Sequence, residues 1–418
     1  MDVKYAFLIL GFLFLSACGQ PKTTASVFKE TSASECPGTS RDNRYIVEWE
    51  NGETTVENTS NRENFKNEFV TPHLDEIRSI YPDRQVKLME NSTSLGSVTA
   101  TASAPTMPTI PPPPNYWGQN MIQSEAVWNQ NVLGEGVLVG VVDSFIDVEH
   151  VQLKSRIAYN TKEIPNNGLD DDENGFVDDY AGMSFVSGRA KTSPHGTHVT
   201  GIIAADPSMG NMKGTAPKAL IIPAPFISDD GSGSLADAVT ALNYVASRGA
   251  KVINASWGGS ACVVEALKST FEKLNSQGIL LVVAAGNDGS DLDQRADFPA
   301  SFNMPNQITV AASTATDYMA SWSNSSFNYV HLAAPGDYIY SIIPGNTYDS
   351  FQGTSMAAPF VSGAAALLIS AAPTASAAQI KEALLKSVDI TPQHEFRVSS
   401  HGRLNVKKAL DYLRTKGF

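Results

Sequence analysis

Hydrophobic positions divide the chain into a short N-terminal part of mixed pattern and a longer part built from strongly apolar runs. Five runs rich in Val and Ile recur after residue 116: Gly136–Val142, Ala219–Pro223, Lys251–Ser256, Ile279–Ala285 and Gln307–Ala312. Such runs without polar alternation are typical of parallel strands buried on both faces. Helix-length stretches, for example Leu235–Ser247 and Val263–Gln277, lie between them. Residues 116–414 are therefore predicted to form an α/β domain, a parallel sheet with helices on both faces.

The preceding stretch, residues 44–91, predicts a small separate α+β domain. Arg44–Trp49 alternates like a strand, Asn61–Ile80 spaces its apolar residues like a helix, and Gln85–Met89 predicts a second strand. Residues 92–115 are rich in Ser, Thr and Pro, and six prolines occur in their second half. Proline at that density favours extended chain and excludes helix or sheet interiors, so this segment predicts a linker.

The first residues have the pattern of an export signal. Lys4 precedes the apolar run Tyr5–Ala17, which is shorter than the roughly 20 residues that span a bilayer, so residues 1–17 predict a signal peptide. Leu15–Cys18 (LSAC) resembles a bacterial lipobox, in which the cysteine is lipidated and becomes the mature N-terminus. An ordinary signal peptide followed by a chance cysteine is the alternative. Polar residues 18–43 predict a flexible tether behind the anchor.

The resemblance to lipoproteins also implies a location. A lipidated Cys18 would hold the chain at a bacterial membrane, facing an extracytoplasmic space, and Gly19 in the next position favours the outer membrane. No later run is both long and apolar enough to predict a membrane span, because Val361–Ala372 is rich in Ala, Ser and Gly and suits a buried helix better.

Charge and cysteine content exclude several classes of protein. The chain has 30 basic and 43 acidic residues, a formal net charge of −13, which makes nucleic acid an unfavourable partner. Three cysteines are too few for a disulfide scaffold or a four-thiolate zinc site. Cys36 and Cys262 could pair in an oxidising compartment, and the sequence leaves this open.

Four polar residues stand where strands are predicted to end or helices to begin. Asp143 follows the first apolar run, Asn287 follows Ile279–Ala285, His195 opens the segment HGTHVTG, and Ser355 lies in GTSMAAP before an Ala-rich helix. In a parallel sheet such positions meet at the carboxyl edge. A serine becomes a good nucleophile when a histidine removes its proton, and an acid fixes the tautomer of that histidine.

Two histidines three residues apart, His195 and His198, raise the alternative of a metal site. A helical zinc pair usually has a spacing of four residues with a glutamate between, which this segment lacks. His198 is therefore predicted to be a packed or hydrogen-bonded neighbour.

Five segments together resemble the successive signature blocks of the subtilisin-like serine proteases, the subtilases. These segments are Val137–Asp147, His195–Gly201, Asn254–Gly258, Ala284–Asn287 and Gly353–Pro359. The order Asp, His, Ser is also that of subtilisin. The resemblance implies that Asp143 orients His195, that His195 acts as general base and then acid, and that Ser355 attacks the peptide carbonyl. It further implies that Asn287 donates to the oxyanion and that Ser256, Trp257 and Gly258 pair with an extended substrate.

The same resemblance gives residues 44–91 a role and identifies two departures. Family members often carry a small prodomain that assists folding, occupies the cleft as an intramolecular inhibitor and is later removed, although an unrelated binding module remains the alternative. Phe145 stands where the family has glycine, which predicts restricted space nearby. Gln152 stands where the family has a calcium-ligating aspartate.

The segment Asp170–Asp179 (DDDENGFVDD) is the second chemical candidate. Asp170, Asp172, Asn174 and Asp178 follow positions 1, 3, 5 and 9 of an EF-hand loop, with Gly175 at position 6. The closing glutamate is absent, because Ala181 stands at position 12. These residues predict a structural calcium site of another closure, and a solvated acidic loop is the alternative. No cofactor is predicted for catalysis.

The sequence as a whole predicts a secreted, lipid-anchored serine endopeptidase, made as a zymogen, that acts on protein or peptide substrates. One alternative is a catalytically silent surface lipoprotein that binds peptides in the same cleft. A calcium-dependent adhesion protein would explain the acidic segment but leaves the four catalytic blocks unexplained.

Overall fold

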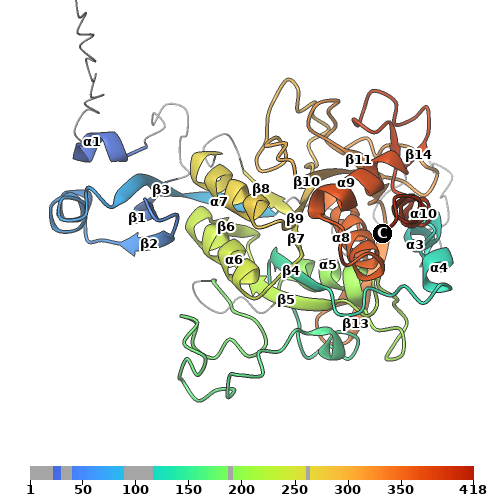
Figure 1. The fold of residues 1–418 in the computed structure, drawn as a ribbon, viewed down its shortest axis with the longest axis horizontal. Coiled ribbons are helices and arrows are strands. Elements are labelled where there is room, and N and C mark those ends of the chain that lie inside the picture. Colours follow the sequence, from blue (N-terminus) through green and yellow to red (C-terminus); the bar gives the residue numbers. More distant parts are fainter. Residues whose placement is uncertain (1–21, 30–39, 89–115, 187–191, 260–263) are drawn as a thin grey trace, which may run out of the picture.

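The computed structural model describes residues 22–29, 40–88, 116–186, 192–259 and 264–418. Figure 1 shows a small N-terminal unit, in blue, beside a larger domain coloured from green to red. Cys18, Cys36 and Cys262 lie outside the described residues, as does the predicted linker at 92–115. The predictions that concern them are therefore not tested by the fold.

The larger domain is built on an eight-stranded sheet in the order β14-β15-β11-β10-β9-β7-β4-β5. All neighbours from β5 to β15 run parallel, and β14 joins the edge antiparallel. The strands are β4 (Leu138–Asp143), β5 (Leu220–Pro225), β7 (Val252–Ala255), β9 (Leu280–Ala284), β10 (Gln307–Ser313), β11 (Leu332–Pro335), β14 (Asp389–Ile390) and β15 (Gly402–Arg403). The five predicted runs form β4, β5, β7, β9 and β10, which confirms the predicted parallel α/β fold.

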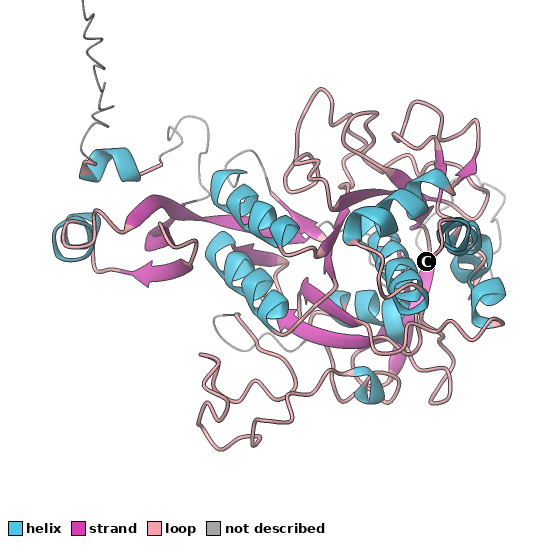
Figure 2. Cartoon of the chain, in the orientation of Figure 1, coloured by secondary structure: helices cyan, strands magenta, loops and turns pink. Residues whose placement is uncertain are grey.

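Helices cover both faces of this sheet, as Figure 2 shows. Val139 and Val141 of β4 belong to a buried apolar cluster with α5 and α8, whereas Val142 belongs to a second cluster with α6 and α7. Alternate side chains of one strand thus enter two separate cores, which explains why the runs are apolar throughout. The helices are α3 (Trp117–Met121), α4 (Ser124–Trp128), α5 (His195–Ala204), α6 (Leu235–Ser247), α7 (Val264–Ser276), α8 (Thr354–Ala371), α9 (Ala377–Lys386) and α10 (Val406–Thr415).

Among the described residues, α8 alone has the length and hydropathy that a membrane span would need. In the structure 83% of its apolar window is buried inside the protein, against the central sheet and α5. The helix is therefore part of the core, as its content of Ala, Ser and Gly predicted. A hairpin of β12 (Ile339–Ile343) and β13 (Thr347–Phe351), which the pattern did not predict, packs beside α5.

The N-terminal unit is a three-stranded antiparallel sheet with a short helix, in agreement with the predicted α+β composition. β1 (Ser40–Trp49) lies between β2 (Thr54–Asn58) and β3 (Ile77–Leu88). The helix predicted over Asn61–Ile80 is shorter than expected. It comprises α2 (Arg62–Asn64) and a π-helical turn, η1 (Phe65–Val70), because residues 77–80 instead enter β3 and bury Ile77 and Ile80 in the core of the unit.

Residues 22–29 correct the prediction of a flexible tether. They include a helical turn, α1 (Thr24–Val27), that packs on the N-terminal unit, where Val27 is only 2% exposed. The Lys29 amide donates to the Ile80 carbonyl at 2.9 Å. The Lys22 ammonium binds Glu50 at 2.6 Å and the Ile77 carbonyl at 3.1 Å. This part of the polar segment is therefore folded onto the unit that follows it, although its composition is that of a linker.

Candidate functional site

Asp143 and His195 form a buried hydrogen-bonded pair at the carboxyl edge of the sheet. Asp143 is the last residue of β4 and His195 the first residue of α5, and both are essentially inaccessible to solvent. The distance between His195 Nδ1 and Asp143 Oδ1 is 2.7 Å. An ionised carboxylate accepts and does not donate, so this contact places the proton of a neutral His195 on Nδ1 and leaves Nε2 as the basic nitrogen.

Two local features hold α5 this close to the end of β4. The Ser144 hydroxyl accepts a hydrogen bond from the Gly196 amide at 3.0 Å, and the Ser144 amide donates to Asp143 Oδ1 at 2.7 Å. A side chain on residue 196 would place its Cβ 2.4 Å from the Ser144 carbonyl oxygen. The glycine after His195 is therefore required by close packing.

Ser355 lies at the start of α8, on the same edge of the sheet as the histidine, because α8 packs directly against α5. Its hydroxyl lies 3.2 Å from the carbonyl oxygen of Ser256, and the Ser256 hydroxyl donates to the Ser355 carbonyl at the same distance. This reciprocal contact fixes the start of α8 against the residue that follows β7.

A series of buried side-chain hydrogen bonds stabilises that contact. Asn254 is fully buried in β7, where its amide donates to the Ser256 hydroxyl at 3.0 Å and accepts from the Ser362 hydroxyl of α8 at 2.8 Å. Asn254 is the first residue of the signature segment Asn254–Gly258, but only the tertiary structure shows that it joins β7 to α8.

Asn287 follows β9 and is oriented by Thr354, a residue that the sequence analysis did not single out. Asn287 Oδ1 accepts from both the amide and the hydroxyl of Thr354, each at 2.9 Å. The Gly286 amide in turn donates to the Thr354 hydroxyl at 3.0 Å. With its oxygen held in this way, the Asn287 side chain directs its NH₂ group away from Thr354. Thr354 adjoins Ser355 in the GTS motif, and this motif was the sequence signal that could have identified Thr354.

Electrostatic conditions differ between the two histidines. His198 is fully buried, donates from Nε2 to the Ile339 carbonyl at 2.9 Å and stacks on Phe351. Burial and the neighbouring His195 lower the pKa of His198 to about 3, so it stays neutral. These contacts confirm the prediction that His198 is a packed, hydrogen-bonded neighbour.

Near the loop of Asn287, burial raises the pKa of Asp297 to about 6.

The end of β3 lies beside the segment that contains Ser256. It pairs antiparallel with β6 (Ser232–Ser234) on one side and β8 (Trp257–Gly258) on the other. Leu88 faces Trp257, the residue that follows Ser256, and the Leu88 amide donates to the Gly231 carbonyl at 2.9 Å. Val86 is completely buried within the apolar cluster of α6 and Trp257. The strand predicted to pair with extended substrate is thus paired with a strand of the same chain, as Figure 1 shows.

The two departures from the family pattern have different consequences. Phe145 does not have a positive φ angle, so the backbone there needs no glycine. Gln152 is fully buried, and its NH₂ group donates to the carbonyls of Asp206 and Met212 at 2.7 and 2.6 Å. Two carbonyl oxygens that converge at this position are therefore satisfied by an amide.

The acidic segment does not arrange its residues as the EF-hand spacing suggested. Asp170 accepts from the amides of Asn174 and Gly175, and Asp178 from those of Asn167 and Gly168. Both carboxylates therefore stabilise turns of the loop. Asn174 likewise uses its side-chain oxygen locally, accepting from the Phe176 amide at 2.8 Å.

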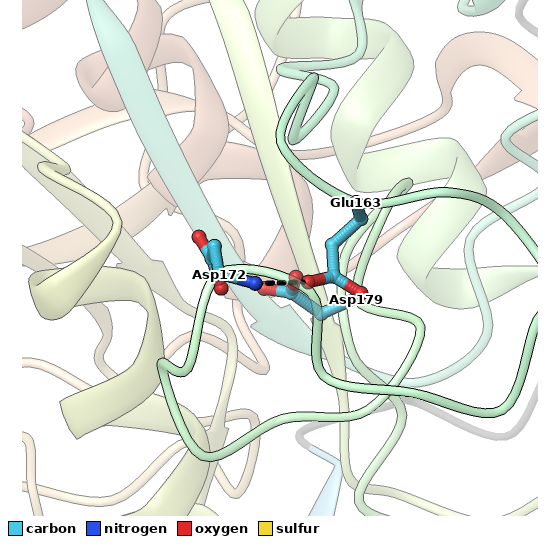
Figure 3. A group of neighbouring side chains, drawn as sticks. All are labelled: Glu163, Asp172 and Asp179. Carbon is cyan, nitrogen blue, oxygen red and sulfur yellow. Dashed lines mark hydrogen bonds between the residues drawn. The ribbon is translucent and has the colours of Figure 1, made fainter.

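A different set converges instead. Carboxylate oxygens of Glu163, Asp172 and Asp179 lie within 4.8 Å of one another, as Figure 3 shows. Glu163 is 4% exposed; its Oε1 accepts two loop amides, whereas Oε2 is buried with no hydrogen-bond partner among the described residues. Asp179 is fully buried and binds Arg248 at 2.9 Å. Glu163 was not identified from the sequence because it lies outside the acidic run.

A parallel α/β sheet with a serine, a histidine and an aspartate at its carboxyl edge defines a class, the serine hydrolases. The comparison with known proteins makes the assignment specific. The profile of the subtilase family matches residues 134–407, which is most of the larger domain. The chain belongs to the subtilase family and is a serine endopeptidase of the subtilisin type.

Individual relatives agree with this assignment. The chain is 34% identical to subtilisin DY of Bacillus licheniformis over 272 residues, covering 64% of this chain and 89% of that protein. It is 38% identical to an intracellular serine protease of Paenibacillus polymyxa over 256 residues, covering 60% of this chain and 72% of the relative. A match to subtilisin-like protease 2 of Plasmodium falciparum, 36% identical, covers 61% of this chain and 19% of that protein.

Proposed function

We propose that the protein cleaves peptide bonds through Ser355, His195 and Asp143. Ser355 Oγ attacks the carbonyl carbon while its proton passes to His195 Nε2, and the Nδ1–H bond to Asp143 stabilises the resulting imidazolium. The histidine then gives that proton to the leaving amine, which produces an acyl-enzyme. A water molecule, deprotonated by the same histidine, releases the acid and restores the serine. The 2.7 Å contact between Asp143 and His195 at the edge that carries Ser355 is the observation that supports this most directly.

The oxyanion that forms in this reaction requires donors beside Ser355. The held orientation of Asn287 supports a role for its NH₂ group, and the N-terminus of α8 adds backbone amides with the positive end of the helix dipole. Both are fixed before substrate binds, so they need little reorganisation as the negative charge develops.

A serine-directed fluorophosphonate distinguishes this enzyme from a silent peptide-binding lipoprotein. The probe reacts only with a serine activated by its neighbours. Covalent labelling at Ser355, found by peptide mapping of the processed protein, supports the catalytic mechanism. A folded protein that binds peptides and is not labelled favours the silent alternative.

We further propose that residues 44–91 form an inhibitory prodomain. The pairing of β3 with β6 and β8 supports this role, because an extended strand occupies the surface that a substrate would use. The pairing of Leu88 with Trp257, the residue after Ser256, supports a cut within a few residues after Leu88, rather than in the proline-rich stretch.

Processing is therefore expected to depend on Ser355. Wild-type protein should yield a mature enzyme whose N-terminus lies shortly after Leu88, whereas Ser355→Ala protein should remain a single chain. N-terminal sequencing and intact-mass measurement of both proteins make this test. An active enzyme that retains residues 44–88 covalently would identify the unit as a permanent module.

The LSAC sequence supports the proposal that Cys18 is lipidated and that the chain is held at an extracytoplasmic membrane face, the outer membrane being favoured. One acyl chain binds a membrane only marginally, but two or more anchor it stably. Cys18→Ser is expected to move the N-terminal unit from the membrane fraction to the soluble fraction. Cys36→Ser is the matched control and should leave the distribution unchanged. A Cys18→Ser protein that stays membrane-bound would require another anchor.

The acidic loop supports a second proposal, a structural calcium ion held by Glu163, Asp172 and Asp179. The buried, unpartnered Glu163 Oε2 fits a cation better than a solvated loop, because an isolated buried carboxylate oxygen is costly. Hard oxygen ligands are those that calcium prefers. Since the loop joins β4 to α5, the ion would stiffen the connection between Asp143 and His195. Catalysis itself needs no metal in this scheme.

Calcium is expected to raise the melting temperature of Ser355→Ala protein, a background in which self-digestion cannot interfere. Binding to the folded state alone contributes about 2.7 kcal/mol when calcium exceeds its Kd a hundredfold. At roughly 2 °C per kcal/mol for a large domain, the increase is about 5 °C.

Matched variants identify the ligands. Glu163→Gln and Asp172→Asn should abolish the calcium response, whereas Asp178→Asn should keep it, because Asp178 serves the turn at Asn167 and Gly168. Superimposable melting curves of the Ser355→Ala protein with calcium and with chelator would contradict the calcium proposal and favour a solvated loop without a bound ion. Loss of the response in Asp178→Asn alone would instead favour the ligand set predicted from the EF-hand spacing.

A further inference from the structure

A cluster of charged and polar residues joins the N-terminal unit to the start of α6. It consists of Arg44 of β1, Asp83 of β3, Ser234 and Asp237, and is called here the Asp83 latch. Arg44 Nη1 binds Asp83 Oδ2 at 3.3 Å and the Ser234 hydroxyl at 2.9 Å, while Nη2 binds Asp237 Oδ1. Asp83 Oδ1 accepts from the Ser234 hydroxyl at 3.1 Å and from the Ala236 amide at 2.9 Å.

The latch is buried on both sides of the interface. Asp83 is completely inaccessible, Asp237 is 7% exposed, and the side chain of Arg44 is 21% exposed. Burial raises the pKa of the Asp83 carboxyl, although the Ala236 amide and Arg44 oppose this effect. Asp83 also places a negative charge at the N-terminus of α6, a helix of thirteen residues. The positive end of the helix dipole stabilises that charge. Removing one member would leave the others buried without compensation.

The order of segments along the chain gives this contact a further consequence. Residues 22–29 are folded onto the N-terminal unit, so Cys18 precedes a docked segment by only a few residues. The proposed cut lies after Leu88, between that unit and the larger domain. Cutting there would leave the lipid-bearing cysteine on one fragment and Ser355 on the other, with no covalent bond between them.

We propose that the Asp83 latch retains the larger domain on the N-terminal unit after the chain is cut, so that the enzyme stays at the membrane by a non-covalent contact with its own anchored fragment. This rests on the proposed prodomain and lipid anchor. Release of an active protease from the membrane is then governed by opening of the latch, together with separation of β3 from β6 and β8.

The test cuts the chain without relying on its own activity. Membranes that carry full-length Ser355→Ala protein are treated briefly with a glutamyl endopeptidase, for which Glu90 follows β3 closely. After sedimentation, both fragments of the protein with an unmodified latch should remain in the pellet. In Arg44→Met or Asp237→Asn protein, the larger fragment should dissociate about 30- to 3,000-fold faster and appear in the supernatant.

Arg78→Met is the matched control. Arg78 lies on the same side of the N-terminal unit, beside a cavity of about 240 Å³ that faces α7, but its side chain is 51% exposed and pairs with Glu50 of its own unit. Exposed pairs of this kind contribute little, so Arg78→Met should behave like the parent protein. Asp237→Asn alters the catalytic side only, which keeps the test valid if Arg44→Met prevents folding.

Separate outcomes distinguish the proposals. If the N-terminal fragment itself is soluble, the anchor proposal fails, and co-elution of the two fragments in size-exclusion chromatography still measures the latch. If the larger fragment is released at the same rate from Arg44→Met, Asp237→Asn and parent membranes, the latch proposal is overturned. Whether wild-type protein cuts itself does not affect either measurement.

Discussion

Ser355→Ala is expected to lower turnover of a peptide substrate about 10⁶-fold, because loss of the serine removes the whole nucleophilic route, as in subtilisin. Ser355 is the only member of the proposed triad that forms a bond to the substrate. The remaining oxyanion donors and substrate binding should leave a residual rate about 10³-fold or more above that in water. Steady-state kinetics with a chromogenic peptide measures the loss, after residues 44–91 have been removed from both proteins with an added glutamyl endopeptidase, because the variant is not expected to process itself.

Ser370→Ala provides the control for this variant. Ser370 lies on the same helix, α8, where its hydroxyl donates only to the Leu367 carbonyl of that helix. Its removal should leave kcat/KM unchanged within a factor of about two, since surface changes without further contacts rarely exceed 0.5 kcal/mol. Equal activity of wild-type and Ser355→Ala proteins would exclude Ser355 as the nucleophile.

Asp143→Asn is expected to lower kcat about 10⁴-fold while substrate binding and fold are preserved. The asparagine keeps the size of the aspartate, but its amide can hold His195 in the wrong tautomer and cannot stabilise the imidazolium. The complete burial of Asp143 and its 2.7 Å contact with His195 make this effect large. Measurement of kcat and KM separately should place the loss in kcat.

Asp147→Asn is the matched control for that variant. Asp147 lies in the same signature block, but its two carboxylate oxygens accept from the amides of Glu149 and Gly345. Its activity should stay close to that of the parent protein. A fall in kcat of less than tenfold in Asp143→Asn would mean that another group orients the histidine.

Most of the larger domain was predictable from the sequence because its signals are local. Each buried parallel strand is a short apolar run, and its ends are marked by the change to polar residues, so β4, β5, β7, β9 and β10 were found within two residues. The helix Leu235–Ser247 was found with its correct ends because Ser234 caps it and the apolar spacing continues to Ser247. His198 was correctly predicted to be a packed, hydrogen-bonded neighbour.

Three features were not predictable, since each depends on contacts between distant segments. Residues 77–80 have a helical spacing, yet they form a strand because β1 offers a hydrogen-bonding edge beside them. Residues 22–29 have the composition of a linker, yet Val27 is buried by the core of the N-terminal unit. Glu163 joins Asp172 and Asp179 only through the path of the loop, whereas Asp170 and Asp178, two of the residues that the EF-hand spacing selected, accept hydrogen bonds from loop amides.

The sequence by itself determined the α/β class, the identity and order of Asp143, His195 and Ser355, and the subtilase resemblance, because these are carried by short motifs whose residues are neighbours in the chain. The tertiary structure decided how the motifs are held: Thr354 orients Asn287, Asn254 joins β7 to α8, and β3 pairs with β6 and β8 while Asp83 meets α6. The contact of Asp83 with the Ala236 amide, for example, joins residues 153 positions apart. Hydrogen bonds and burial between such residues leave no periodic trace in the sequence, since either partner alone is an ordinary polar residue at the end of a strand or helix.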